Sequence, residues 1–363
     1  MNQRERFLNT MRFKSVDRVP FYIGGPWATT LKRWHSEGLP ENVDLNRLFD
    51  ADGVVELGIY FGMCPAFERT VLEEDDAFVV YINHEGIKMR EKKTDPETSM
   101  PDFLEFPVKN REDYHKLKWR FRLNAQQRIT EEWKKRARFY NENSNLPIRM
   151  FADREGGFFG PLRNLMGLEN LVLTFYDDPV LIEEMMDDKA ELIIAIVDEI
   201  LKYTKIDFFA FWEDMAYNHG SLISPQMVRK FMLPRYRKVT DFLRSKGIDL
   251  IFVDSDGDIS ELIPIWLEAG INGVWPLEVQ SGMDVVKLRQ EYPELRMIGG
   301  IDKKVLAKDE RAIREEILRK VPPLIEKGGY IPDVDHSIPP DVPLKNYLYY
   351  LKCLRSVIEK GSC

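Results

Sequence analysis

The order of apolar and polar positions divides the chain into two parts near residue 147. Beyond that point, short apolar runs alternate with amphipathic segments of about ten residues or more, which predicts repeated strand–helix units. The predicted strands cover 148–152, 206–212, 248–253, 271–275, 296–300 and 330–331, and the predicted helices cover 159–177, 180–204, 225–245, 258–268, 283–291, 308–326 and 343–360. This alternation is typical of a parallel sheet covered by helices.

The first 147 residues follow a less regular pattern. We expect helices at 2–12, 28–37, 44–50 and 125–142, extended segments at 19–23 and 54–60, a β-hairpin or small antiparallel sheet at 67–92, and irregular chain at 96–110. The whole chain, 1–363, is therefore predicted to be a single domain. In it, 1–147 form an N-terminal elaboration with the first strand, and 148–363 form the regular units.

A parallel sheet of this kind is either an open, doubly wound sheet or a closed barrel. No Gly-x-Gly-x-x-Gly follows a predicted strand, so the nucleotide-binding fingerprint of the open sheet is missing. Polar residues end one strand after another, which suits a ring of loops around a single active-site mouth. The pattern favours an α/β fold of the (β/α)8 TIM-barrel type with an N-terminal elaboration that includes a β-hairpin.

Composition limits the partners and the location. The net charge is −8, so the surface lacks the basic excess that binds nucleic acids or anionic membranes. We see no secretion signal and no apolar stretch long enough to span a membrane. Cys64, Cys353 and Cys363 are too few and too far apart to predict a disulfide framework. We expect a cytoplasmic protein, with a homodimer left open.

Acidic residues and one histidine follow the predicted strands. Asp254 and Asp256 alternate after one strand, so an extended chain would point both side chains the same way. Glu213 and Glu278 follow two other strands, and His336 follows the last one. In a barrel these groups converge, where they would share protons or bind a divalent metal ion.

Simpler roles exist for the same residue types. Aspartate often caps helices and stabilises turns, so we interpret Asp258 and Asp302 as caps. His336 is either a site residue or a core histidine bonded to the backbone, and both interpretations stay open.

Aromatic residues also cluster near the expected mouth. Some of them must pack in the core, whereas others would form the apolar wall of a small-molecule pocket. The candidates are Trp27, Phe158, Phe159, Phe211, Trp212, Tyr217 and Trp275.

Several segments, taken in order, resemble the uroporphyrinogen decarboxylase superfamily. They are Asp-Arg-Val-Pro at 17–20, Gly-Gly-Phe-Phe-Gly-Pro at 156–161, Trp-Glu-Asp-Met at 212–215 with Ser-Pro at 224–225, Gly-Gly-Ile-Asp at 299–302, and Asp-His-Ser-Ile-Pro at 335–339. The resemblance covers nearly the whole chain and implies a TIM barrel.

Departures from the family pattern indicate which branch of the superfamily the chain resembles. True uroporphyrinogen decarboxylases carry an Arg-Gln-Ala-Gly-Arg segment that binds the substrate's carboxylates, whereas this chain has Ile-Gly-Gly-Pro-Trp at 23–27. The chain is more similar to the corrinoid-linked methyltransferases, in which a His-x-Cys-Gly segment and a later Cys hold zinc. Asp254, Asp256 and His336 stand at these three positions. The resemblance thus implies a divalent metal, zinc, on these residues, with Glu213 or Glu278 as fourth ligand or proton donor.

The resemblance implies a methyltransferase that moves a methyl group from a small donor to the cobalt of a corrinoid carried by a partner protein. A methoxylated aromatic compound, in an O-demethylation, would suit the aromatic residues. One alternative is a metal-free decarboxylase or lyase acting on a small carboxylic acid, with Asp254, Asp256 or Glu213 as the acid–base group. Another is a non-catalytic small-molecule binding protein that kept the fold.

Overall fold

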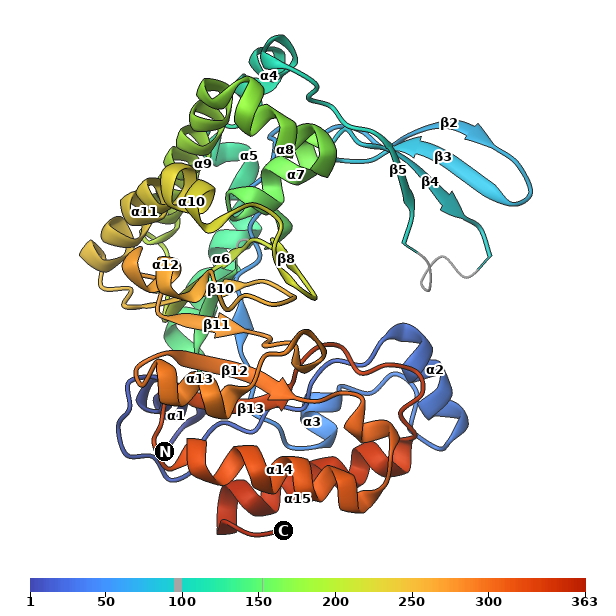
Figure 1. Cartoon of the computed structure of the whole chain (residues 1–363), viewed down its shortest axis with the longest axis vertical. Coiled ribbons are helices and arrows are strands. Elements are labelled where there is room, and N and C mark those ends of the chain that lie inside the picture. Colours follow the sequence, from blue (N-terminus) through green and yellow to red (C-terminus); the bar gives the residue numbers. More distant parts are fainter. Residues whose placement is uncertain (95–99, 152) are drawn as a thin grey trace.

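The computed structural model describes residues 1–94, 100–151 and 153–363. Its centre is a curled sheet of seven parallel strands (Figure 1). Their spatial order is β1 (Val55–Glu56), β6 (Ile148–Phe151), β7 (Phe208–Trp212), β10 (Leu250–Asp254), β11 (Gly273–Trp275), β12 (Arg296–Ile301) and β13 (Tyr330–Val334). The predicted parallel α/β architecture is confirmed. Ala152 of the predicted first regular strand and part of the predicted irregular stretch lie outside the described residues.

An extended segment links the two edges of this sheet. The Phe21 carbonyl accepts a hydrogen bond from the Asp52 amide, just before β1, at 2.9 Å. The Gly25 carbonyl accepts one from the Ile338 amide, just after β13, also at 2.9 Å. The expected strand at 19–23 therefore runs extended beside both edge strands but joins no ladder. Pro20 and Pro26 bracket it, and proline has no amide proton to give to a ladder.

Helices cover the outer face of the sheet. They are α7 (Phe159–Met166), α8 (Leu168–Asp177), α9 (Pro179–Ile200), α10 (Pro225–Met227), a π-helical turn (Val228–Met232), α11 (Leu233–Ser245), α12 (Ile263–Glu268), α13 (Val285–Glu291), α14 (Glu310–Ile325) and α15 (Leu344–Lys360). Short 3-10 turns lie at Lys118–Arg120, Asp153–Glu155, Val279–Ser281 and Val305–Ala307.

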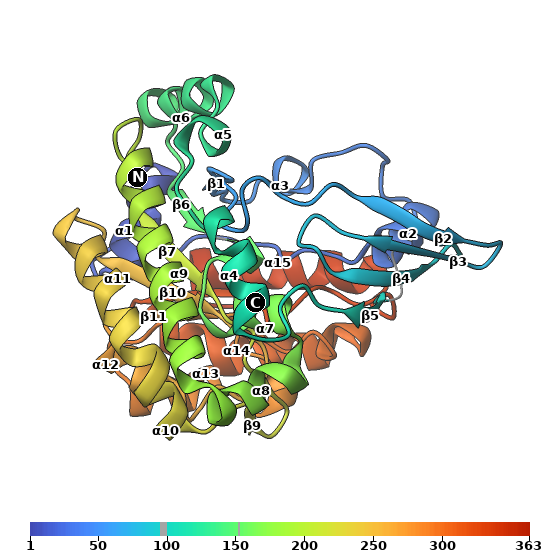
Figure 2. The same ribbon diagram turned by 90° about the horizontal axis from the view of Figure 1, so that it is seen from above.

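The N-terminal part adds a second, smaller sheet. The helices of this N-terminal part are α1 (Gln3–Met11), α2 (Ala28–Ser36), α3 (Leu45–Leu48), α4 (Arg111–Leu117), α5 (Ala125–Arg128) and α6 (Glu131–Asn143). Strands β2 (Thr70–Glu74), β3 (Phe78–Ile82), β4 (Lys88–Lys92) and β5 (Asp102–Glu105) form an antiparallel sheet. Figure 2 shows this sheet on the opposite side of the molecule from α9 and α11.

Both faces of the curled sheet are buried, as its strand sequences require. Successive residues of a strand point to opposite faces. In β7, Phe208 and Ala210 face the interior cluster, whereas Phe209 and Phe211 face the helices. Residues Phe7 and Met11 of α1 pack into the same interior cluster. The N-terminal helix therefore contributes to the core inside the curled sheet.

Further features differ from the sequence predictions. Helix α4 and a small hairpin of β8 (Ala216–Tyr217) and β9 (Gly220–Ser221) were not predicted. Cys353 and Cys363 form a disulfide, so the prediction that the cysteines form none is wrong. Gly361 has a φ of 73°, and this left-handed turn after α15 brings Cys363 back to the helix. Among the described residues, no helix has the length and apolar character needed to cross a membrane.

Candidate active site

A cavity of about 350 Å³ opens at the carboxyl ends of the central strands. It is lined by Arg154, Trp212, Asp214, Asp254, Asp256, Trp275, Pro276, His336 and Ser337. The register of the sheet explains why these residues meet. Asp254 is the direct partner of Trp212 in β7 and of Trp275 in β11. Two indole rings therefore flank one carboxylate at the mouth, the usual site of chemistry in folds of this type.

The loop after β10 is held so that Asp256 also faces the cavity. Gly257 has a φ of 84°, and a Cβ atom there would lie 2.6 Å from the backbone of Ala216. Only glycine allows this close approach. The Ser255 hydroxyl accepts a hydrogen bond from the Met215 amide at 3.1 Å, and the Gly257 amide donates to Glu278 at 3.2 Å. The loop is thus fixed on both sides by its neighbours.

His336 and Asp256 form a contact across the mouth. The His336 Nε2 atom lies 3.3 Å from Asp256 Oδ2. The His336 Nδ1 atom accepts a hydrogen bond from the Ser337 amide at 2.7 Å. A neutral His336 therefore carries its proton on Nε2, which faces Asp256. The hydrogen bond to Asp256 raises the pKa of His336 against the opposing effect of burial. The contact with the Asp256 carboxylate therefore favours the protonated imidazole of His336.

Asp254 has a different environment in the same cavity. Burial raises its pKa to about 7, and the negative charge of Asp256 adds to this effect. Within the part of the chain that the structure describes, no lysine, arginine or histidine forms an ion pair with it. Asp254 is therefore partly protonated near neutral pH. A carboxyl group of this kind can give up or take a proton during catalysis.

The predicted proton donors Glu213 and Glu278 lie outside this cavity lining. The fully buried Glu213 carboxylate accepts hydrogen bonds from the amides of Phe158, Phe159 and Gly160, and from the Tyr236 hydroxyl at 2.6 Å. It holds the first turn of α7 against β7. Glu278 accepts a hydrogen bond from Lys303 at 2.8 Å as well as from the Gly257 amide. Both carboxylates support the loops of the site.

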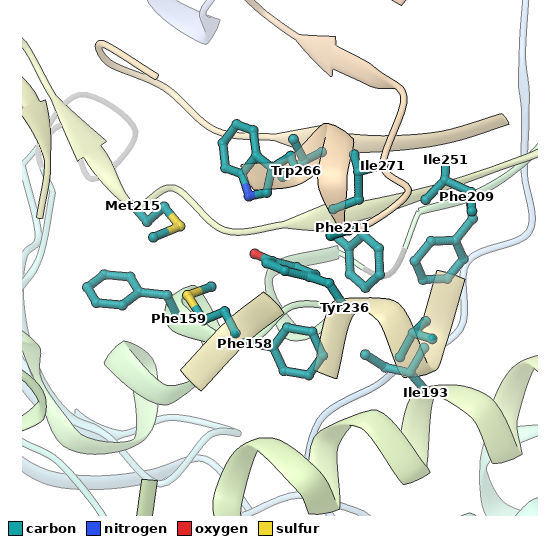
Figure 3. Close-up of a cluster of buried hydrophobic side chains, with 14 of the residues drawn as sticks. Phe158, Phe159, Ile193, Phe209, Phe211, Met215, Tyr236, Ile251, Trp266 and Ile271 are labelled. Atoms are coloured by element: carbon teal, nitrogen blue, oxygen red, sulfur yellow. The ribbon is translucent and has the colours of Figure 1, made fainter. Parts of the chain in front are cut away.

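Only two of the predicted substrate-binding aromatics, Trp212 and Trp275, line the cavity. Phe158 and Phe159 have no exposed surface and pack in the core, where Figure 3 shows them with Phe211 and Tyr236. Trp27 and Tyr217 are about half exposed and are not part of the lining. The predicted aromatic pocket is therefore smaller than the sequence suggested.

Arg154, Asp214 and Ser337 line the cavity and were not predicted as site residues. Arg154 lies over the Trp212 ring, with 5.3 Å between the guanidinium carbon and the ring centre. Asp214 pairs with Arg163 at 2.8 Å. Arg154 is the second residue after the predicted strand 148–152, and this position near a strand end was the available signal in the sequence. Asp258 and Asp302 were predicted as helix caps, but each accepts a hydrogen bond from the amide two residues later, that of Ser260 or Lys304, and so stabilises a turn instead of capping a helix.

The residues present do not fit the implied zinc site. Asp254, Asp256 and His336 line one cavity, but the described residues contain no group of three His, Cys, Asp or Glu side chains placed to hold a metal ion. The Nε2 atom that would bind a metal faces Asp256 as a proton donor. No thiolate, the ligand type of the related sites, lines the cavity. We therefore derive no chemistry from a bound metal.

Comparisons with known proteins place these features in a family. A family model described as uroporphyrinogen decarboxylase (URO-D) matches residues 97–357. The uroporphyrinogen decarboxylases of Geobacter metallireducens and Trichlorobacter lovleyi are 27% and 26% identical over 145 residues. These matches cover 39% of this chain and 40% of each relative.

A solved structure is similar over almost the whole chain. It is a methyltransferase from Methanosarcina mazei, with a TM-score of 0.64 and 14% sequence identity. The similarity covers 97% of this chain and 98% of that one. At this level of identity the likeness shows a shared fold.

Proposed function

The chain belongs to the uroporphyrinogen decarboxylase family, and on this premise we propose that it is a methyltransferase. In this proposal it moves a methyl group from a small donor to a corrinoid carried by a partner protein. The observation that carries the proposal is Asp254, a carboxyl group with a pKa raised to about 7 at the mouth of the fold. The solved methyltransferase with the same fold gives additional support.

The proposed reaction needs a proton at a defined place. When a methyl group leaves an oxygen or nitrogen atom, the electron pair of the broken bond stays on that atom. A proton delivered there stabilises the leaving group. Asp254 is suited to this task because burial raises its pKa to about 7, so its carboxyl group is partly protonated near neutral pH.

The other residues of the cavity position the donor and maintain the charge balance. Trp212 and Trp275 flank Asp254 and restrict the donor to the space above it. The Asp256–His336 pair lies beside Asp254, so its protonation state changes the local charge. The corrinoid, when bound, supplies the nucleophile that accepts the methyl group. Side chains of this protein hold the donor and the proton.

Decarboxylation of uroporphyrinogen fits the cavity less well. Among the residues that the structure describes, its lining contains three aspartates and one arginine, Arg154. A substrate with many carboxylates would face these aspartates instead of arginine partners. Decarboxylation of a smaller acid is a second candidate, since Arg154 could hold one carboxylate and Asp254 could protonate the carbon left after loss of carbon dioxide.

An anaerobic assay with cob(I)alamin tests the proposal. The protein is mixed with cob(I)alamin and a panel of methoxylated aromatic compounds and methylated amines, and the loss of the cob(I)alamin absorbance is followed. We expect enzyme-dependent loss with at least one donor, and demethylated product in equal amount. Release of carbon dioxide from a small acid, with no methyl transfer to any donor, would favour the decarboxylase instead.

A further inference from the structure

A second cavity lies inside the curled sheet, next to the first. Its volume is about 170 Å³, and Trp275 and Pro276 line both cavities. Tyr22, Phe208, Arg149 and Asp333 are among its other walls. The first cavity lies at the loops, whereas this one reaches residues of the interior cluster such as Phe208. The two cavities therefore share the Trp275 side chain as part of their walls.

Two ionisable side chains, Arg149 and Asp333, line this inner cavity. Arg149 is paired with Glu56, and its guanidinium lies over the Trp275 ring at 5.3 Å. Asp333 accepts one hydrogen bond, at 2.8 Å, from the amide of the next residue, Val334. Among the residues that the structure describes, no cationic side chain pairs with Asp333. A carboxylate in a low-dielectric site without a counter-ion is costly, and burial accordingly raises the pKa of Asp333 to about 7. A ligand that supplies a positive charge beside Asp333 would stabilise its charged form.

The walls indicate what kind of cation fits. Tyr22, Phe208 and Trp275 present aromatic surfaces to the cavity, and the Phe252 ring lies 5.4 Å from that of Trp275. Aromatic faces attract alkylammonium ions through the ring quadrupole, and their apolar surface suits methyl groups. A hard metal ion would need several oxygen ligands, but among the described residues Asp333 is the one carboxylate in the lining. The combination of a single carboxylate and aromatic walls matches a methylated ammonium group.

We propose that the inner cavity binds an organic ammonium ion, such as a methylated amine, with Asp333 as its counter-ion and Tyr22, Phe208 and Trp275 as its walls. Binding itself is independent of the reaction proposed above.

The test uses two probes of equal shape. Choline carries a trimethylammonium group, and 3,3-dimethylbutan-1-ol has an uncharged carbon in place of the nitrogen. By isothermal titration calorimetry, we expect choline to bind one site per chain at least tenfold more tightly than the alcohol. In Asp333→Asn the affinity for choline should fall at least tenfold. Asparagine keeps the oxygen that accepts from the Val334 amide, so this variant is expected to fold.

A matched control removes the same charge elsewhere. Asp309 is an exposed residue that caps α14, and asparagine is an equally good cap, so Asp309→Asn should bind choline like the wild type. Equal affinity for choline and the alcohol would overturn the proposal, as would unchanged choline binding in Asp333→Asn or no saturable binding at all. Choline binding without methyl transfer from any donor would refute the proposed reaction but leave this site intact.

Discussion

Replacing Glu213 distinguishes a structural carboxylate from a catalytic one. The Glu213→Ala variant loses the acceptor for three backbone amides and for the Tyr236 hydroxyl, all of them buried. Each buried donor left unpaired costs about 1–3 kcal/mol, so four of them predict a loss of at least ~4 kcal/mol. This is a large share of the roughly 5–15 kcal/mol that stabilises a typical domain.

Glutamine at the same position gives the sharper comparison. In Glu213→Gln, the amide oxygen can occupy the place of Oε2, which accepts from Phe158, Phe159 and Gly160. The amide nitrogen then faces the oxygen of Tyr236, and the expected loss is only about 1–2 kcal/mol. Unlike a catalytic acid, this residue should therefore tolerate glutamine with little loss of activity.

Urea unfolding and the methyl-transfer assay measure the two properties on the same proteins. Glu291→Ala, at an exposed position of α13, is the control and should change stability by no more than about 0.5 kcal/mol. An alanine variant at 213 as stable as this control would refute the structural role. A glutamine variant that is stable but inactive would also refute the structural role, since that result would assign Glu213 a part in the reaction itself.

Three further predictions concern the cavity. Because burial raises the pKa of Asp254 to about 7, the protonated acid is lost as pH rises through 7, and the transfer rate should fall about tenfold per pH unit above it; a flat pH–rate profile up to pH 9 would contradict this. Because the hydrogen bond to Asp256 raises the pKa of His336, Asp256→Asn should lower that pKa in an NMR titration of the histidine ring protons, and an unchanged value would show that the pair does not form in solution. Protein purified without chelator should hold far less than one zinc ion per chain by mass spectrometry. If the wild type held one zinc per chain and the Asp254→Ala, His336→Ala double variant held none, these residues would form a zinc site after all.

The sequence pattern predicted the regular part of the fold well because its signals are local. Each predicted strand from 206 to 331 overlaps an observed parallel strand, and Ser224 caps α10 as a serine before proline should. The edge segment at 19–23 was harder, because its apolar run favours a strand while its flanking prolines limit pairing. Strand β5 (Asp102–Glu105) fell in the stretch expected to be irregular, since its ladder with β4 (Lys88–Lys92) is a long-range contact.

The candidate site was predicted only in part for a similar reason. Asp254, Asp256 and His336 were expected to converge, and all three line one cavity. Trp212 and Glu213 were both predicted as site residues, yet adjacent residues of a strand point to opposite faces. Trp212 therefore lines the cavity while Glu213 is buried beneath α7 (Phe159–Met166). If the alternation of side chains had been applied to the last residues of the strand, it would have placed Trp212 and Glu213 on different faces. No local pattern in the sequence, however, shows that His336 contacts Asp256.

The central claim is that Asp254 delivers the proton to the leaving group, and one comparison tests it directly. Single-turnover methyl transfer to cob(I)alamin is measured for the wild type and for Asp254→Asn. One donor has a strongly basic leaving group, and the other carries a nitro substituent that stabilises the leaving anion. We predict a loss of about 100-fold or more with the first donor and near wild-type rates with the second. Equal losses with both donors, or none with either, would contradict the assignment of Asp254 as the proton donor.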